Sequence, residues 1–162
     1  MIPLKINGKH LVEIFDPTAA AALETDEAKI RYSLKKQMYP SSVELNAETY
    51  SRDAERTANY ELEDLTLVNR KVKPIFTWEV IKADYVKKLM EFLEYKTNYK
   101  NLLGEIVPVD APVYRITFYD LTGERTIDSY LGQTIECELK EYLVNDTPVL
   151  YWENFRIAFP EV

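Results

Sequence analysis

The chain has 162 residues, of which 46% are hydrophobic and 12% aromatic, and its formal net charge at pH 7 is −7. This length is typical of one domain, and the apolar content supports a packed core instead of a disordered chain. The acidic balance argues against sequence-specific binding of duplex DNA or RNA, because such proteins present basic patches to the phosphates. A single cysteine excludes an internal disulfide, and no apolar run approaches the roughly 20 residues of a membrane helix.

Residues 2–15, IPLKINGKHLVEIF, predict a β-hairpin at the start of the chain. Asn7 and Gly8 are the preferred pair for a two-residue type I′ turn, because both turn positions need a positive φ. Pro17 then ends the second strand, since proline cannot donate to a strand ladder.

Residues 16–40 differ in composition and predict a partly helical insertion or projecting segment, with helix over about 17–40. The run 19–23 favours helix, and Thr25 is placed to begin a second helix. That second helix would carry three apolar residues at helical spacing: Ile30, Leu34 and Met38. An ordinary surface helix is the alternative interpretation of this segment.

The stretch 70–93 predicts a strand that runs directly into the principal packing helix. Apolar residues first recur two apart, as on one face of a strand: Val72, Phe76, Trp78 and Val80, with Pro74 in phase. The period then changes to that of a helix over about 83–95, with one apolar stripe: Val86, Leu89, Met90 and Leu93. One strand and one amphipathic helix need a sheet to complete the core.

From residue 113 onward the sequence is strongly β. Strands are predicted at 113–120, 125–132, 134–144 and 154–159, with turns at 121–124 and 145–148. Cys137 lies in phase with Ile135 and Leu139, which predicts a buried core thiol. Residues 96–112 contain Gly104, Pro108 and Pro112 and are predicted to be a broken connection. We expect an α+β, mainly β fold, an antiparallel β-sandwich or incomplete barrel of about seven to nine strands.

No catalytic constellation is visible. His10 is the only histidine and has no nearby serine or cysteine, so a surface histidine is expected there. The four glycines form no phosphate loop, and no metal, cofactor or enzymatic activity is predicted. A carbohydrate- or peptide-binding module is the alternative function, and it would use aromatic residues mainly of the carboxy-terminal strands: Tyr114, Phe118, Tyr119, Tyr130, Tyr142, Tyr151, Trp152 and Phe155.

Three features together resemble the short tail proteins of tailed bacteriophages and prophages, in the group with a tail-tube-like fold. They are the opening hairpin LKING at 4–8; the polar segment DAERT at 53–57 followed by FTWE at 76–79 and the helix; and the ending, with YRITFYD at 114–120, YLG at 130–132 and LYWENFRI at 150–157. The resemblance covers about 1–15 and 43–160, and leaves 16–40 as the inserted part.

The resemblance implies a single tail-tube-like domain over 1–162, without catalysis or cofactors, that forms a ring with copies of itself, commonly a hexamer. It further implies contacts with other tail proteins in the virion tail, after synthesis in the bacterial cytoplasm. Exposed strands would pair between subunits, and the polar segment would reach a neighbouring subunit or the next ring. The candidate assembly interface is Arg52, Asp53, Glu55, Arg56, Tyr60, Glu61 and Glu63.

Overall fold

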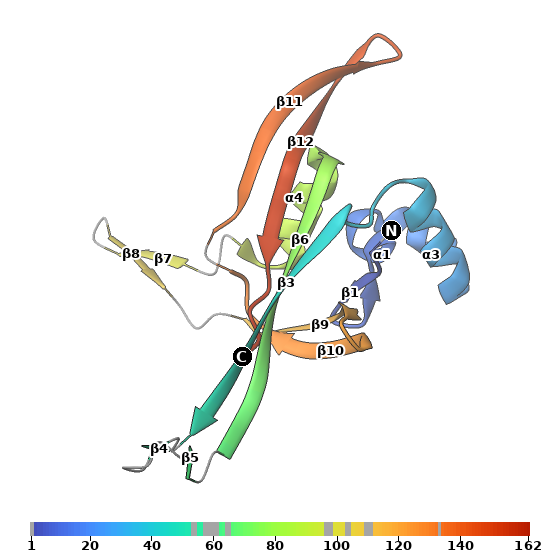
Figure 1. The fold of residues 1–162 in the computed structure, drawn as a ribbon. Helices are drawn as coiled ribbons and strands as arrows, with labels where there is room; N and C mark the ends of the chain where they lie inside the picture. Colours follow the sequence, from blue (N-terminus) through green and yellow to red (C-terminus); the bar gives the residue numbers. More distant parts are fainter. Residues whose placement is uncertain are drawn as a thin grey trace.

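A computed structural model describes residues 2–52, 55–56, 62–63, 66–95, 99–102, 105–108, 112–132 and 134–162. Within these residues the chain forms two four-stranded antiparallel sheets, two short two-stranded hairpins and four helices (Figure 1). The structure thus confirms the prediction of an α+β, mainly β, sandwich-like fold, with more strands than the sequence indicated.

The first sheet joins the amino-terminal hairpin to two later strands. Its strands are β1 (Leu4–Ile6), β2 (Lys9–His10), β9 (Tyr114–Asp120) and β10 (Gly123–Ser129), in the order β10-β9-β1-β2. Asn7 and Gly8 have φ values of 53° and 74°, as the predicted turn requires. The Asn7 Oδ1 also accepts the backbone N–H of Arg115 at 2.8 Å, so the turn is fastened to β9.

The predicted second strand of this hairpin is wrong beyond His10, because the chain turns into helix α1 (Leu11–Phe15). The Glu13 side chain accepts the His10 backbone N–H at 2.8 Å, which satisfies a donor at the start of the helix. Leu11, Val12, Ile14 and Phe15 are all buried. Four apolar residues among five fit a short helix that is packed on several sides. The same residues would also fit a strand buried on both faces, so the sequence pattern does not distinguish the two.

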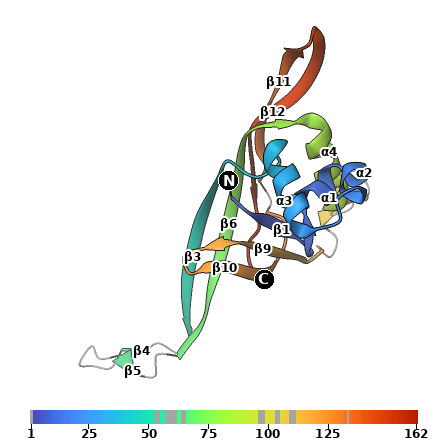
Figure 2. The ribbon, with the colours of Figure 1, turned by 90° about the vertical axis from the view of Figure 1, so that its right-hand side faces the viewer.

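The second sheet contains the longest strands of the molecule. They are β3 (Ser42–Arg52), β6 (Thr66–Lys82), β11 (Glu136–Val144) and β12 (Thr147–Ala158), in the order β11-β12-β6-β3. Helix α4 (Ala83–Phe92) follows β6 without a loop, as the change of period predicts. In Figure 2 the helices α1, α3 (Asp26–Lys35) and α4 lie on one side of the β3–β6 ribbon.

Aromatic side chains join the two sheets across the core. Phe76 of β6 lies 6.2 Å from Phe118 of β9, measured between ring centroids, and 6.0 Å from Phe159. Within the second sheet, the Trp78 ring lies 5.6 Å from that of its cross-strand partner Phe155, measured between centroids. The helix α4 adds the buried Val86, Leu89 and Leu93. This is the core that the apolar stripes of 70–93 predicted.

Val80 is the exception to the predicted strand face, because its side chain is 46% exposed while Ile81 is buried. An irregularity in the neighbouring strand β12 explains why the inward-facing positions of β6 shift by one residue here. Asn154 lies across from this point of β6 and has a φ of 51°, which breaks the regular alternation of β12. Trp152 and Ile81, which are paired in register, therefore face inward on the far side of the irregularity.

The segment 16–40 forms helix α2 (Pro17–Ala21) and helix α3. Thr25 accepts an N-terminal N–H group of α3, at the helix start predicted for it, and Asp16 accepts one of α2, which was not predicted from the sequence. Met38 lies beyond the end of α3 and is fully buried, so its predicted helical position is wrong. The Trp78 Nε1 donates a hydrogen bond of 2.8 Å to the Met38 carbonyl. The core thus holds the chain where it returns from α3 to β3.

The two small hairpins are β4 (Glu55–Arg56) with β5 (Leu62–Glu63), and β7 (Tyr99–Leu102) with β8 (Glu105–Pro108). The second of them corrects the expectation of a broken connection over 96–112. Pro108 is compatible with pairing because it stands at the end of the ladder, opposite Tyr99, where a missing N–H matters least. Gly104 lies outside the described residues.

Candidate functional site

Strands β11 and β12 form a hairpin that extends away from the body of the molecule, past helix α4 (Figure 1). We call residues 136–153 the projecting hairpin. Every residue of β11 is exposed, and the strands remain paired up to Val144 and Thr147. Asn145 and Asp146 close the turn with φ values of 51° and 61°, which confirms the turn predicted there.

The burial predicted for Cys137 and Leu139 is wrong. Cys137 is exposed, and Leu139 is 48% exposed. Side chains of β11 alternate between its two faces, but both faces are exposed in the part of the chain that the structure describes. Partial desolvation still raises the pKa of the Cys137 thiol, so little of the reactive thiolate is present at neutral pH.

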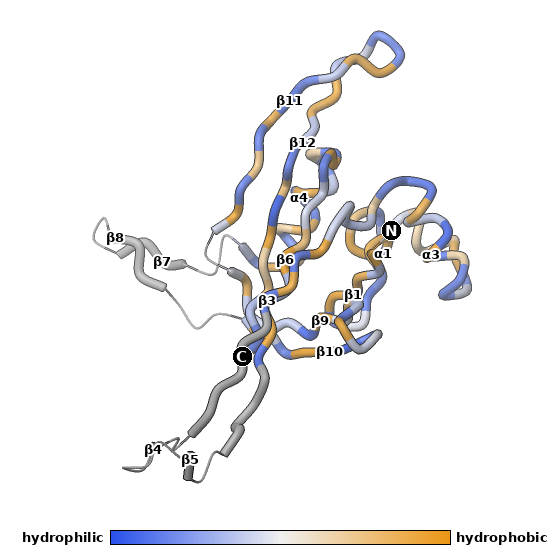
Figure 3. The backbone as a smooth tube through the Cα atoms, in the orientation of Figure 1, coloured by the Kyte–Doolittle hydropathy of each residue, from blue (hydrophilic) through white to orange (hydrophobic). Residues whose placement is uncertain are grey.

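The register of the projecting hairpin divides its side chains into two faces. Leu139 pairs with Trp152, Glu141 with Leu150, and Leu143 with Pro148, so these residues share one face. We call it the leucine face; its apolar residues are Leu139, Leu143, Pro148, Leu150 and Trp152, and the charged Glu141 lies among them. Leu143 is 73% exposed and Leu150 49%. Figure 3 shows hydrophobic positions recurring along the hairpin to its tip.

The opposite face carries an aromatic pair. The Tyr142 and Tyr151 rings meet edge to face with centroids 5.4 Å apart, and the Tyr142 hydroxyl donates a hydrogen bond to Glu153. That hydrogen bond is the main cause of the raised pKa of Tyr142. These contacts hold the side chains of this face in place without burying them.

Strand β11 is also an edge of the second sheet, so the outer backbone groups of its nine residues face no strand of the described chain. An exposed edge with apolar side chains is a template for pairing with another chain. Contiguous exposed apolar surface of this kind marks interaction sites. The projecting hairpin therefore combines an edge strand with exposed apolar side chains.

A groove opens beside the base of the projecting hairpin. It has a volume of about 530 Å³ and lies between α4 and Trp152 of the leucine face. We call it the α4 groove, and its lining is Ala83, Val86, Lys87, Met90, Glu91, Glu94, Tyr95 and Trp152. The apolar residues form most of its surface, and the three charged residues stand on α4 or directly after it.

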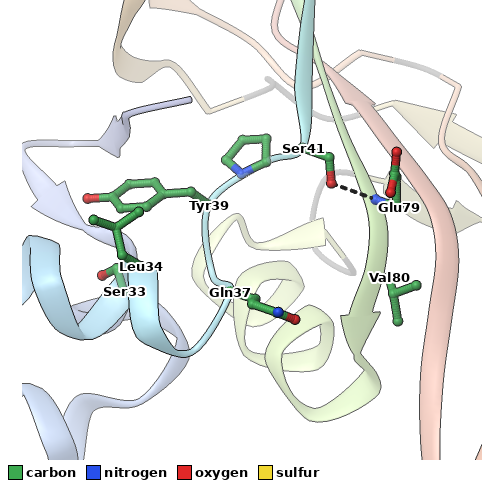
Figure 4. A pocket seen from close by; sticks show the side chains of 8 residues that line it. Ser33, Leu34, Gln37, Tyr39, Ser41, Glu79 and Val80 are labelled. Carbon is green, nitrogen blue, oxygen red and sulfur yellow. Dashed lines mark hydrogen bonds between the residues drawn. The ribbon is translucent and has the colours of Figure 1, made fainter. Parts of the chain in front are cut away.

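A second cavity, of about 400 Å³, lies where the chain passes from α3 to β3 and faces β6 (Figure 4). Its hydroxyl groups are already engaged: the Ser41 Oγ accepts the Glu79 backbone N–H at 3.0 Å, and the Ser33 Oγ donates to the Lys29 carbonyl at 2.8 Å. Burial raises the pKa of Tyr39. The lining holds no histidine or cysteine, and its one charged side chain is that of Glu79.

His10 is 4% exposed, so the prediction of a surface histidine is wrong. Its Nε2 lies 3.2 Å from the Asp26 Oδ1, because α3 folds back over the start of α1. Glu13 stands beside it and accepts a hydrogen bond of 2.9 Å from the Lys29 Nζ. The histidine thus belongs to a polar contact between two helices.

The predicted assembly interface is only partly described. Arg52 pairs with Thr66 at the end of the long β3–β6 ribbon, and Glu55 pairs with Glu63 in the small hairpin beyond it. Arg56 pairs with Leu62. The remaining predicted residues lie outside the described part of the chain: Asp53, Tyr60 and Glu61. Their role in assembly stays a prediction.

The aromatic residues of the alternative binding module separate in space. Tyr114, Phe118 and Phe155 are buried in the core. Tyr119 is exposed on β9, while Tyr142 is exposed on the projecting hairpin. The half-buried or exposed remainder is Tyr130, Tyr151 and Trp152. On the projecting hairpin, Tyr142 and Tyr151 share one face and their rings are in contact, while Trp152 lies on the opposite face.

Sequence reasoning missed the leucine face and the α4 groove. The available signal was the presence of apolar residues in both phases of 139–144. We interpreted only the phase of Ile135, Cys137 and Leu139, and took it as core, because a covered and an uncovered strand share the same pattern. Among the described residues, no group of three or more His, Cys, Asp or Glu side chains is placed to hold a metal ion. None of the described helices has the length and apolarity needed to span a bilayer.

Comparisons with protein-family models, with curated proteins and with solved structures found no match.

Proposed function

We propose that this protein is a non-enzymatic structural subunit of a bacteriophage tail, which assembles with copies of itself and with other tail proteins in the virion. The observation that carries the proposal is the projecting hairpin, which exposes Leu139, Leu143 and Leu150 on one face and whose strand β11 is an edge of the second sheet within the described residues. The resemblance of the sequence to short tail proteins supplies the biological setting.

Burial of the exposed leucines would contribute a favourable free energy to association. Burying one exposed leucine contributes about 1.5–3 kcal/mol, and the leucine face offers several such side chains in a row. The free edge of β11 adds backbone hydrogen bonds once another strand pairs with it. A hairpin carried away from the core contributes little to folding of the body, so its apolar surface is available for a partner.

The long β3–β6 ribbon supplies a second projecting element at another part of the molecule. A subunit that contacts its neighbours through different surfaces forms head-to-tail interfaces, which close into rings when the rotation allows it. This arrangement matches the ring that the resemblance implies. The candidate residues Arg52, Glu55, Arg56 and Glu63 would then serve contacts between neighbouring subunits or stacked rings.

The test measures molecular mass against concentration by light scattering and sedimentation, with electron microscopy of the concentrated sample. We expect rings, tubes or concentration-dependent oligomers. The variant Leu143→Asp should shift the protein to monomer, while Leu121→Asp should not, because Leu121 is 82% exposed but lies in the turn between β9 and β10.

A strict monomer at every concentration, with no assembly on addition of other tail proteins, would refute the proposal. Quenching of Trp152 fluorescence by a glycan or peptide would then favour the binding-module alternative. The fluorescence of Trp78 serves as an internal reference because that side chain is 1% exposed.

A further inference from the structure

We infer that strand β11 of the projecting hairpin pairs antiparallel with β11 of a second copy, around a two-fold axis that passes between the two Leu139 residues. The pair would extend the second sheet of each subunit across the contact. This inference rests on the proposed function, and it names the strand and the register through which two subunits associate.

The outer edge of β11 is open to a further strand. Strand β12 lies between β11 and the rest of the second sheet, and the hairpin extends away from the body (Figure 1). The register of the hairpin shifts near Asn154, where the extra residue belongs to β12, so β11 itself runs as a regular strand. Among the described residues, no strand pairs with its outer side.

The turn of the hairpin determines which backbone groups of β11 face outward. In a hairpin with a two-residue turn the closing residues, here Val144 and Thr147, exchange backbone hydrogen bonds, and so does every second residue along the strand. The alternate residues Leu139, Glu141 and Leu143 therefore direct their N–H and C=O groups to the open side. A second β11 presents the same groups, so the two strands can satisfy each other.

The charges of β11 select one register for this pair. A two-fold axis perpendicular to the sheet passes between two copies of the same residue, so each register is defined by its central residue. The registers with the longest overlap are centred on Leu139, Lys140 or Glu141. A centre at Lys140 or Glu141 places like charges directly opposite each other, which destabilises a strand pair. The Leu139 register places an apolar side chain there instead.

In the Leu139 register, opposite charges meet on both sides of the axis. Lys140 of each copy faces Glu138 of the other, and within one chain the Lys140 Nζ already lies 3.3 Å from the Glu138 Oε1. The axis therefore produces a cluster of four alternating charges. Glu138 also stands opposite Glu153 in its own hairpin, which is an unfavourable pairing. The lysine of the second copy brings further positive charge to these two carboxylates.

The leucine face gains a continuous apolar row in the same register. Leu139 is paired with Trp152 in the hairpin and is 48% exposed. With two Leu139 side chains adjacent at the axis, the row across the four strands consists of Trp152, Leu139 and their counterparts in the second copy. At each end of the overlap, Leu143 of one copy comes opposite Ile135 of the other. Apolar surface that is exposed in the monomer is thus covered.

The contact joins two copies and no more, because the same strand is used on both sides. One strand pair covers less than the roughly 800 Å² that a stable interface buries on each partner, so we expect a reversible, concentration-dependent dimer. The head-to-tail contacts of a ring would use other surfaces, such as the β3–β6 ribbon.

A single cysteine at the centre of the register tests the axis. In a Cys137→Ser background, Leu139→Cys should form a disulfide-linked dimer on mild oxidation, because the two central Cα atoms would be about 5.5 Å apart. Glu141→Cys in the same background is the matched control. It lies on the same face, but two copies of residue 141 would be roughly 13 Å apart along the strands, so no dimer above background is expected.

A second crosslink tests the register independently. Cys137 of one copy would face residue 141 of the other, so Glu141→Cys in a chain that keeps Cys137 should give a dimer with two intermolecular disulfides. The wild-type protein, which has Cys137 alone, should give none. Mass spectrometry of the unreduced peptides identifies the linked residues. A dimer linked through residue 137 of both copies would overturn the inferred register.

Mixing of charge variants provides the third test. Lys140→Glu alone and Glu138→Lys alone would each place like charges opposite each other, and each should weaken dimerisation by at least about tenfold in sedimentation. An equimolar mixture of the two variants should recover most of the loss, because opposite charges then meet on both sides of the axis. Both side chains are exposed, so circular dichroism of each variant should match wild type.

The outcomes separate this inference from the function it rests on. If the wild-type protein assembles but the Leu139→Cys dimer and the recovery on mixing are both absent, the β11 pairing is wrong and the structural function stands. If the crosslinks form as expected but nothing larger than a dimer appears, even with other tail proteins, the pairing stands and the proposed function fails. A strict monomer without crosslinks would overturn both.

Discussion

Glu13 links the first helix of the chain to the third. One of its carboxylate oxygens accepts the His10 backbone N–H at 2.8 Å, and the other accepts the Lys29 Nζ at 2.9 Å. Partial burial would raise the pKa of Glu13, but the hydrogen bonds from Lys29 and from His10 outweigh it, and the pKa is lowered. The ionised form is therefore the one that the folded protein stabilises.

This shift predicts a pH-dependent contribution to stability. A carboxyl group whose pKa is lower in the folded state stabilises the fold above its unfolded pKa, and the contribution is lost as the pH falls through the folded pKa. Glu13→Gln should therefore lower the free energy of unfolding by on the order of 1 kcal/mol at neutral pH. The difference from wild type should close in acid, as followed by urea unfolding at several pH values.

Glu24→Gln is the matched control, because Glu24 is exposed just before α3. It should change stability little at any pH. A Glu13→Gln effect that stayed constant into acid would contradict the role assigned to the carboxylate.

At the level of elements, two turns of the same conformation perform different tasks. Asn7 and Asn145 both begin two-residue turns with positive φ, at 53° and 51°. The Asn7 turn is fastened to β9, since its side chain accepts the Arg115 N–H at 2.8 Å and its backbone N–H donates to the Arg115 carbonyl at 2.7 Å. The Asn145 turn stands at the end of the projecting hairpin.

Replacement of these asparagines should separate the two roles. Asn7→Ala loses a hydrogen bond and places a side chain with a Cβ in a left-handed conformation without the compensation that asparagine offers, which costs about 1–3 kcal/mol. Asn145→Ala should lower the free energy of unfolding by less, as measured by denaturant titration. Only the cost of the left-handed backbone conformation applies there, and the end of the hairpin can fray without opening the core.

Asn7→Gly separates the two causes of the destabilisation expected for Asn7→Ala. Glycine accepts the positive φ, so this variant should recover the conformational part and retain only the loss of the hydrogen bond. Equal destabilisation by Asn7→Ala and Asn7→Gly would show that backbone strain has no share in the effect.

At the scale of the whole molecule, the packed core lies in the body, and the projecting hairpin extends away from it. The body contains the Phe76–Phe118 contact between the two sheets, the Trp78–Phe155 contact within the second sheet, and the buried stripe of α4. The projecting hairpin shares none of this core beyond Trp152, which packs partly against it. Stability and assembly should therefore respond to different substitutions.

Shortening the hairpin tests this division. Lys140 and Tyr151 are paired in register, so residues 141–150 can be replaced by an Asn-Gly turn that closes directly on that pair. The melting temperature measured by calorimetry should change by no more than a few degrees, while sedimentation should show loss of assembly. Unfolding of the shortened protein would show that the hairpin supports the body after all.

The sequence by itself determined the local conformations. The Asn7–Gly8 turn, the helix starts at Asp16 and Thr25, and the stripe of Val86, Leu89 and Leu93 all depend on interactions within a few residues. The same holds for the buried alternation of β9 and for the turn at 145–146. Propensity, capping and periodicity are local physics, and they predict local structure.

Only the tertiary structure decided which surfaces are covered. Cys137 and Leu139 alternate as in a core strand but project beyond the body, while His10 is covered because α3 folds back over it. Residues 11–15 form a helix because Glu13 accepts a hydrogen bond at its start and neighbouring elements bury its sides. A periodic pattern states which side chains share a face, and burial of that face depends on where distant segments of the chain come to lie.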